Sequence, residues 1–142
     1  MTSRPQPRRS AESSQVVAEL NVEVVAVEER LWSGRAKLVI AQTTEGEIGV
    51  MAGHEPLLGQ LVEGGIIAIT TVDDERMVAA VHGGFLSVTA ETVTVLAESA
   101  DWSTDIDIEE AREALHHWSA EATADEKAAL RARGRIRAVE RS

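Results

Sequence analysis

The side chains in this sequence that could act in acid–base or metal chemistry are its four histidines, His54, His82, His116 and His117. A nucleophilic triad requires a Ser, Thr or Cys beside the imidazole and a carboxylate that orients it, and no adjacent arrangement of this kind accompanies His54 or His82. His116 and His117 are neighbours on a predicted helix and point in different directions, so they do not form a metal pair. We therefore expect no catalytic residue and no metal site.

His54 lies within "GEIGVMAGHEPLLGQL", residues 46–61, and six of the ten glycines of the chain fall between Gly46 and Gly65. Glycine serves positions that need a positive φ or a close backbone approach, so this segment is expected to form irregular turns rather than long strands. Pro56 biases the residue before it toward an extended conformation and thereby shapes the loop around His54. From the residues alone, His54 either hydrogen-bonds within its own loop or faces a ligand or partner.

The composition fits one ordinary domain, or a small core with an appendage, within 142 residues. Hydrophobic residues make up 44% of the chain, and the absence of cysteine excludes a disulfide scaffold, thiolate metal sites and thiol catalysis. The formal net charge is −10, but residues 1–17 carry +2 and residues 131–142 carry +4, which leaves −16 on residues 18–130. A body this acidic argues against nucleic-acid binding.

Residues 1–17 combine Arg and Ser with no apolar stretch after the basic residues, so they are expected to form a disordered tail rather than a secretory signal. No window of the chain approaches the roughly 18 consecutive apolar residues of a membrane-spanning helix. Direct membrane insertion is therefore not expected, and any association with a membrane would pass through a partner protein.

Residues 19–98 consist of short apolar runs divided by turn residues, which is the pattern of an all-β domain. Turns are expected at Ser33–Gly34 and at the acidic residues 72–75, both flanked by apolar runs. A third turn is expected at residues 89–91, because apolar residues alternate in step on both sides of it in "FLSVTAETVTVLAE". Strands this short and closely spaced favour a two-sheet β-sandwich or a small barrel.

From residue 104 the apolar residues recur at helical spacing, and residues 104–142 are predicted to form an antiparallel two-helix hairpin. Asp107 followed by Glu110 is a capping-box signal for the first helix, and Thr123 followed by Glu126 repeats it for the second. The apolar stripe of the first helix consists of Ile108, Ala111, Leu115, Trp118 and Ala122. Because this stripe is thin, it is expected to dock the hairpin only weakly on the β domain, so that the hairpin can detach.

A mainly β domain with a helical hairpin and no visible catalytic group favours a subunit that acts through protein contacts. Two other classes remain open from the residues. A free-standing β-sandwich would bind a small molecule in a pocket around His54, without any partner. A hydrolase that used His54 or His82 would lose its activity when that histidine is replaced by alanine.

Three segments, "TTEGEIGVMAGHEPLLGQL", "HGGFLSVTAETVTVLAESA" and "IDIEEA", resemble the ε subunit of bacterial F-type ATP synthases. The resemblance runs from about residue 18 to residue 138 and rests on the Gly-Glu-Ile-Gly, Gly-His-x-Pro-Leu and Gly-Gly-Phe motifs in this order. The chain has twelve Arg and almost no Lys, and its C-terminal part is short. In these respects it resembles the actinobacterial version of the family.

The resemblance implies a ten-stranded β-sandwich over residues 18–103, acting as a non-catalytic rotor subunit in the central stalk of a proton-translocating ATP synthase. In that family the sandwich is clamped to the γ subunit and seated on the polar loops of the membrane c-ring, at the cytoplasmic face of the membrane. The resemblance also implies that Glu47 and His54 contact the c-ring and γ. The residues that would shape their loop are Gly46, Gly53, Pro56 and Leu57.

In the same family the helical hairpin is the regulatory element. It lies folded against the sandwich in one state, and in another it extends along γ toward the catalytic α and β subunits and blocks ATP hydrolysis. Residues 104–142 match this element, with Ile108, Leu115 and Trp118 in the apolar stripe. The extended hairpin would present four arginines to acidic surfaces of the catalytic subunits: Arg131, Arg133, Arg135 and Arg137.

Some members of the family bind ATP through an Ile/Leu-Asp-x-x-Arg-Ala motif at the start of the first helix. Ile106, Asp107 and Ala111 match this motif, but Glu110 occupies the Arg position. A carboxylate at that position repels phosphate, so neither a nucleotide site nor a cofactor is expected.

Overall fold

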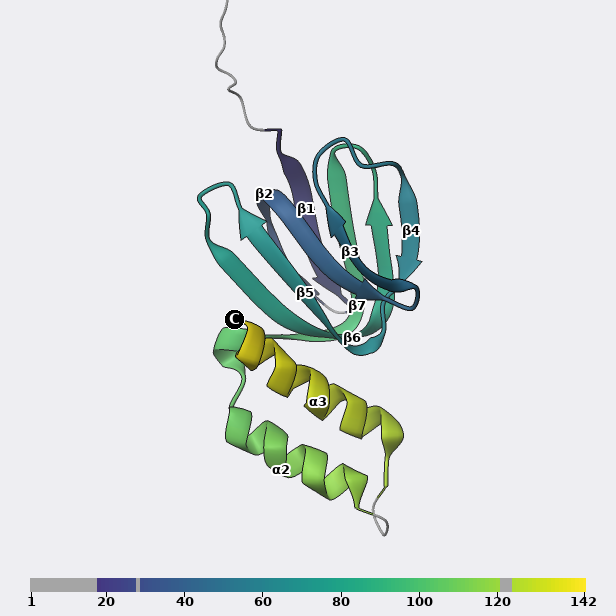
Figure 1. Ribbon diagram of the computed structural model, residues 1–142, viewed down its shortest axis with the longest axis vertical. Coiled ribbons are helices and arrows are strands. Elements are labelled where there is room, and N and C mark those ends of the chain that lie inside the picture. The colour runs from purple at the N-terminus through teal and green to yellow at the C-terminus, as the bar shows by residue number, and fades with distance from the viewer. Residues whose placement is uncertain (1–17, 28, 121–123) are drawn as a thin grey trace, which may run out of the picture.

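The computed structural model describes residues 18–27, 29–120 and 124–142; the expected tail over residues 1–17 lies outside the described residues, as do Ala122 and Thr123. Within these ranges the chain forms seven strands, one short 3₁₀ turn and two α-helices (Figure 1). The strands are β1 (Leu20–Ala26), β2 (Glu29–Thr43), β3 (Gly46–Val50), β4 (Leu57–Gln60), β5 (Glu63–Thr71), β6 (Arg76–Val88) and β7 (Thr92–Trp102). They are followed by η1 (Ser103–Asp105), α2 (Ile108–Ser119) and α3 (Glu126–Arg141).

The strands form where apolar and polar residues alternate, because successive side chains of a strand point to opposite faces of the sheet. In the hairpin of β6 and β7, Leu86 lies opposite Val95 and Val88 lies opposite Val93, and all four side chains are buried. The predicted turn at residues 89–91 is therefore confirmed. The acidic turn at residues 72–75 is also confirmed, since it joins the antiparallel strands β5 and β6.

The sheet runs in the order β1-β7-β6-β5-β2-β3, and an additional pairing of β1 with β2 closes it on itself. The pairing of β1 with β7 is parallel, and the other pairings are antiparallel. The expected sandwich is confirmed. It has seven strands in the described residues instead of ten separate ones, because long strands exchange partners along their length: β6 pairs with β5 up to His82 and with β4 from Phe85.

Two apolar clusters hold the molecule together. The larger one fills the interior of the sandwich and includes Leu20, Ile67 and Leu86. The smaller one lies on the outer face of β5 and β6, where Ala138 of α3 packs on residues such as Ile66. Helix α3 thus lies between the sandwich and α2, which packs on the far side of α3 (Figure 1).

The structure corrects three expectations about local geometry. No turn forms at Ser33–Gly34, because β2 runs through both residues and Gly34 lies opposite Val22 of β1. A side chain at Gly34 would come within 2.6 Å of the indole of Trp32, so the glycine provides room for that ring. The second helix is capped by Asp125, whose carboxylate accepts a hydrogen bond from the Ala128 amide. The helix that docks on the sandwich is α3, and not α2 with its predicted apolar stripe.

Candidate functional site

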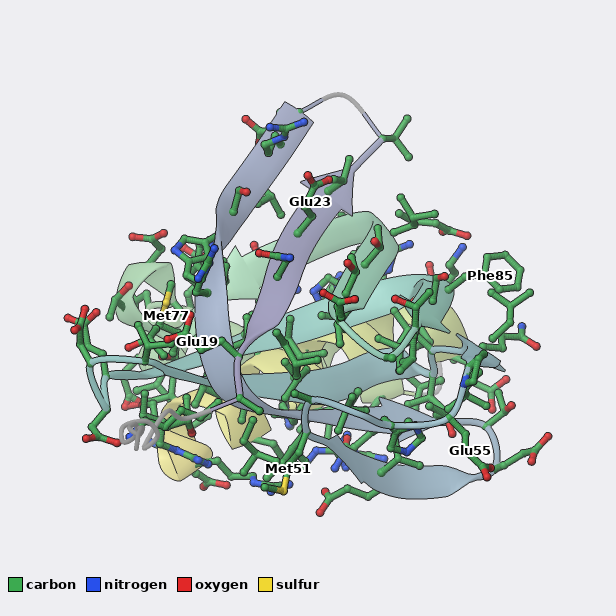
Figure 2. All side chains as sticks on the ribbon, turned by 90° about the horizontal axis from the view of Figure 1, so that it is seen from above. Glu19, Glu23, Met51, Glu55, Met77 and Phe85 are labelled. Carbon is green, nitrogen blue, oxygen red and sulfur yellow. The ribbon has the colours of Figure 1, made fainter. Side chains whose placement is uncertain are left out.

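The glycine-rich segment that follows β3 forms a loop at residues 51–56, which we name the rim loop. Gly53 has a φ of 90°, a conformation that side-chain-bearing residues rarely adopt, and its amide donates to the Ala90 carbonyl at 2.7 Å. The Nδ1–H of His54 donates to the Glu55 carbonyl oxygen at 2.7 Å. His54 therefore makes the hydrogen bond within its own loop that the residues alone allow, and Figure 2 shows Glu55 at the periphery of the molecule.

The second predicted contact residue, Glu47, lies near the other end of β3 and has different partners. Its Oε1 atom is 3.4 Å from the Gln42 amide nitrogen and 3.3 Å from Nη1 of Arg141 at the end of α3. Gly46 precedes it in the turn from β2, whereas Pro56 and Leu57 lead from the rim loop into β4. The structure thus does not bring Glu47 and His54 into one site; it places Glu47 beside the hairpin and His54 at the end of the sandwich near the turn at residues 89–91.

An exposed apolar patch, which we define as Val27, Leu58, Phe85 and Leu96, was not anticipated from the sequence. Phe85 and Leu96 lie opposite each other on β6 and β7, with 51% and 48% of their surfaces exposed. Figure 2 shows the Phe85 ring projecting away from the ribbon. A groove of about 480 Å³ runs beside them, lined by Val25–Val27, Gln60, Gly84–Phe85 and Leu96–Glu98. A contiguous exposed patch of this kind is characteristic of a protein-interaction surface.

The four arginines predicted to act in the extended hairpin have different environments in the docked one. Arg131 Nε lies 2.6 Å from a Glu63 carboxylate oxygen, and Arg137 Nη2 donates to the Gly64 carbonyl at 2.8 Å. Arg133 is exposed, whereas Arg135 is half-buried. Two of the four therefore bind the sandwich directly.

The apolar stripe of α2 is only partly covered. Ala111 is buried, Ile108 and Leu115 are half-buried, and Trp118 is exposed with its ring edge-on to His117 at 4.5 Å between centroids. The Asp107 cap is confirmed, since its carboxylate accepts from the amides of Glu109 and Glu110. The remaining stripe residue, Ala122, lies outside the described residues.

A pocket of about 360 Å³ lies where the ATP motif of the family would lie, at the start of α2. Its charged lining consists of Asp101, Asp105, Asp107, Glu110 and Arg135. Four carboxylates around one guanidinium give this pocket a negative charge, which opposes the binding of a phosphate chain. In the described part of the chain, no cluster of three or more His, Cys, Asp or Glu residues has the geometry to hold a metal ion.

A buried histidine connects the sandwich to this acidic region. His82 is 2% exposed, and its Nε2 lies 2.9 Å from Oδ2 of Asp101. This hydrogen bond lowers the pKa of Asp101 below its ordinary value of 3.8; partial burial acts against the shift, and electrostatic interactions with His82, Arg135 and Arg131 add to it. Asp101 is thus held ionised by groups from both the sheet and α3.

The lowered pKa of Asp101 predicts a pH dependence. Because the folded-state pKa lies below the unfolded one, ionised Asp101 stabilises the fold above its unfolded pKa, and this contribution is lost as the pH falls through the folded value. Asp101→Asn is therefore expected to lower the free energy of unfolding at about pH 7 and to leave it at the wild-type value at about pH 2, as measured by urea unfolding. Asp73→Asn, at an exposed turn position, is the control and should match the wild type at both pH values. A constant difference between Asp101→Asn and the wild type would contradict the prediction.

The structure contains no helix, among the residues it describes, whose length and hydropathy would let it cross a membrane.

The known proteins that this chain resembles give a consistent assignment. The family profile of the ATP synthase delta/epsilon chain β-sandwich domain matches residues 19–103. The ATP synthase epsilon chain of Rhodococcus opacus is 68% identical over 126 residues, which cover 89% of this chain and all of the relative. The epsilon chain of Nocardia farcinica is 59% identical over 122 residues, which cover 86% of this chain and 91% of the relative.

Two solved structures share the fold at lower identity. One is a chain of the Euglena gracilis mitochondrial ATP synthase OSCP/F1/c-ring assembly, with a TM-score of 0.68, 24% identity and coverage of 96% of this chain and 86% of that one. The other comes from the Tetrahymena thermophila central stalk and c-ring, with a TM-score of 0.50, 15% identity and coverage of 86% and 94%. The family profile and the high identity to actinobacterial relatives together show that this chain belongs to the ATP synthase epsilon-chain family, in its actinobacterial form.

Proposed function

We propose that this chain is a non-catalytic subunit of the central stalk of a proton-translocating F-type ATP synthase, where it couples the γ subunit to the c-ring. It would then sit peripherally at the cytoplasmic face of the membrane. Membership of the family supports this role, and the exposed apolar patch is the structural observation that carries it. A patch that includes half-exposed aromatic and aliphatic side chains needs a partner surface, and a rotor subunit has one.

The apolar patch is the proposed γ contact. Phe85 and Leu96 form a cross-strand pair on the outer face of the sandwich, with Leu58 of β4 exposed to 72% in the same region. Large aromatic and aliphatic side chains with neighbouring grooves are the usual anchors of a stable interface. The proposal therefore adds Phe85 and Leu96 to the contact residues that the sequence suggested.

The rim loop is the proposed contact with the polar c-ring loops. His54 would contribute its imidazole to this contact, and Gly53 and Pro56 set the backbone conformation of the loop. Glu47 belongs to a second contact point beside the hairpin. Its pair with Arg141 is 3.3 Å long and half-exposed, so the carboxylate can exchange this partner for one on the c-ring or on γ at little cost.

The hairpin of α2 and α3 is proposed to regulate ATP hydrolysis. In the docked state it is held mainly through α3, since α3 packs on β5 and β6 and α2 packs on α3. Release would free Arg131 and Arg137 from the sandwich and expose them, with Arg133 and Arg135, to the acidic surfaces of the catalytic α and β subunits. Two states that differ in a few such contacts are separated by a small free-energy gap, which a partner can bias.

Capture from membranes of the source organism tests the proposed function. Tagged wild-type chain is expected to bring down γ and the c-ring. The double variant Phe85→Asp, Leu96→Asp is expected to reduce the yield of γ at least about tenfold, because two charges would be buried in the contact. Ala18→Asp, at an exposed apolar position before β1, is the control and should retain the yield. Recovery of the wild-type chain without γ, together with tight binding of a small molecule that depends on His54, would point instead to a free-standing binding protein.

A further inference from the structure

Strand β5 contains an irregularity on the face where α3 packs. The pairing of β5 with β6 shifts register between Glu63 and Gly65, and Gly64 in between has a φ of 71°. This is a β-bulge, in which an extra residue is left out of the ladder and the strand bends. We name Glu63–Gly65 the β5 bulge. Because Gly64 has no side chain, its backbone lies open to whatever packs on this face.

Helix α3 packs its own glycine on the β5 bulge. A Cβ atom at Gly134 would lie 2.6 Å from the Cα atom of Gly64 and 2.7 Å from its carbonyl carbon. In the other direction, a Cβ at Gly64 would lie 2.8 Å from the carbonyl carbon of Leu130. Real Cβ atoms do not approach backbone atoms this closely, so the strand and helix backbones touch directly and both positions require glycine.

Two arginines flank this contact on the same face of α3. Arg131, Gly134 and Arg137 are spaced by three residues, so they line one side of the helix. Arg131 Nε lies 2.6 Å from Glu63, whose side chain is 18% exposed, and Arg137 Nη2 donates at 2.8 Å to the carbonyl of Gly64. The bulge therefore offers one carboxylate and one carbonyl to two guanidinium groups, with a backbone contact between them.

We propose that the β5 bulge is the docking site for the Arg131–Gly134–Arg137 face of α3, and that occupation of this site keeps both arginines from binding any other acidic partner. We name this docking contact the latch. The second half of this inference rests on the proposed regulatory function; the first half does not. The close glycine contact makes docking all-or-none, because a helix that slides or rotates by one residue places a side chain where no space exists. Glu63 and the acidic partner then compete for Arg131.

The glycine contact gives a test in which two effects have opposite signs. Replacing Gly134 with alanine raises the intrinsic helix propensity of α3. A purely structural role of this residue would therefore make the hairpin more ordered. Our proposal expects the opposite for docking: the population of docked hairpin in Gly134→Ala falls at least tenfold relative to undocked hairpin.

The docked population is measurable in the full-length isolated chain, which has no native cysteine. Spin labels on Asp73→Cys, at the β5–β6 turn, and Ser119→Cys, at the end of α2, report the distance between sandwich and hairpin, since both positions are exposed. A single narrow distance distribution in the wild type that becomes broad in Gly134→Ala supports the proposal. An unchanged distance distribution in Gly134→Ala overturns it.

Matched variants separate this latch from general damage. Gly49→Ala in β3 meets only a Leu38 methyl at 3.8 Å and should leave docking unchanged. Arg131→Gln removes the pair with Glu63 and should weaken docking, whereas Arg133→Gln, an exposed position on the same helix, should not. Equal effects of Arg131→Gln and Arg133→Gln would contradict the assignment of Arg131 to the bulge.

Hydrolysis by the assembled enzyme distinguishes the latch from the proposed function. If Gly134→Ala releases the hairpin and also lowers ATP hydrolysis by the complex, both inferences stand. If it releases the hairpin while hydrolysis stays at the wild-type rate, the latch stands and the regulatory role of the hairpin fails. If the hairpin remains docked, the latch fails whatever the rate of hydrolysis.

Discussion

Replacement of Leu86 by alanine is expected to lower the free energy of unfolding by about 2–5 kcal/mol. Leu86 is fully buried in β6, in the main apolar cluster between the layers of the sandwich. Its removal costs the transfer free energy of the missing carbons and leaves a cavity that the rigid closed sheet fills poorly. Urea unfolding of the purified chain, followed by circular dichroism, measures this loss.

Leu96→Ala is the matched control, because the same side chain is removed from the paired strand at a position that is 48% exposed. Its effect on unfolding is expected to be below about 1 kcal/mol. The two variants should also differ in function: Leu96→Ala should impair capture of γ, whereas Leu86→Ala should retain it under conditions where the protein is folded. Equal destabilisation by the two variants would show that the described interior is not the core.

Removal of residues 104–142 is expected to raise ATP hydrolysis by the assembled enzyme by about fivefold or more, the scale of a typical coupling free energy between sites. The physical reason is that the extended hairpin, with its arginines, would no longer reach the catalytic subunits. The measurement is the steady-state rate of hydrolysis by complexes reconstituted with the truncated or the full-length chain. An unchanged rate would mean that the hairpin is not an inhibitor.

Truncation has a side effect that the structure makes explicit. It uncovers the outer face of β5 and β6, where Ile66, Ala68, Val78 and Ala80 are buried beneath the hairpin. A second variant is therefore needed in which the hairpin is kept but its arginines are neutralised, with Arg131, Arg133, Arg135 and Arg137 all replaced by glutamine. This variant should also raise hydrolysis if the arginines make the inhibitory contact. It keeps the apolar side chains of α3 that cover Ile66 and its neighbours, while the loss of the Arg131–Glu63 pair weakens docking.

The sequence predicted those parts of the fold that follow from local alternation and capping. The β6–β7 hairpin is one example, since Leu86, Val88, Val93 and Val95 alternate with polar residues in register. The Asp107 cap is another, because it needs only a side-chain oxygen near the first free amides of the helix. Both depend on residues that are near one another in the chain.

The features that the sequence did not predict depend on residues that are far apart in the chain. Gly134 has a low intrinsic helix propensity, and only its contact with Gly64, seventy positions earlier, gives it a role. Ser33–Gly34 predicts a turn locally, but Gly34 is paired with Val22 of β1, twelve positions earlier, and this pairing keeps both residues extended within β2. Phe85 and Leu96 were hidden in apolar runs, since a strand with hydrophobic residues on both faces gives no sign of which face is exposed.

The closure of the sheet through β1 bears on how the molecule carries mechanical load. β1 is hydrogen-bonded to β2 along one side and to β7 along the other, so twisting one layer of the sandwich relative to the other strains two ladders at once. An open sheet of the same size would yield at a free edge, by peeling one bond at a time. A subunit that receives rotation at one surface and passes it on at another needs such resistance to twisting, because a more compliant subunit would absorb part of the rotation.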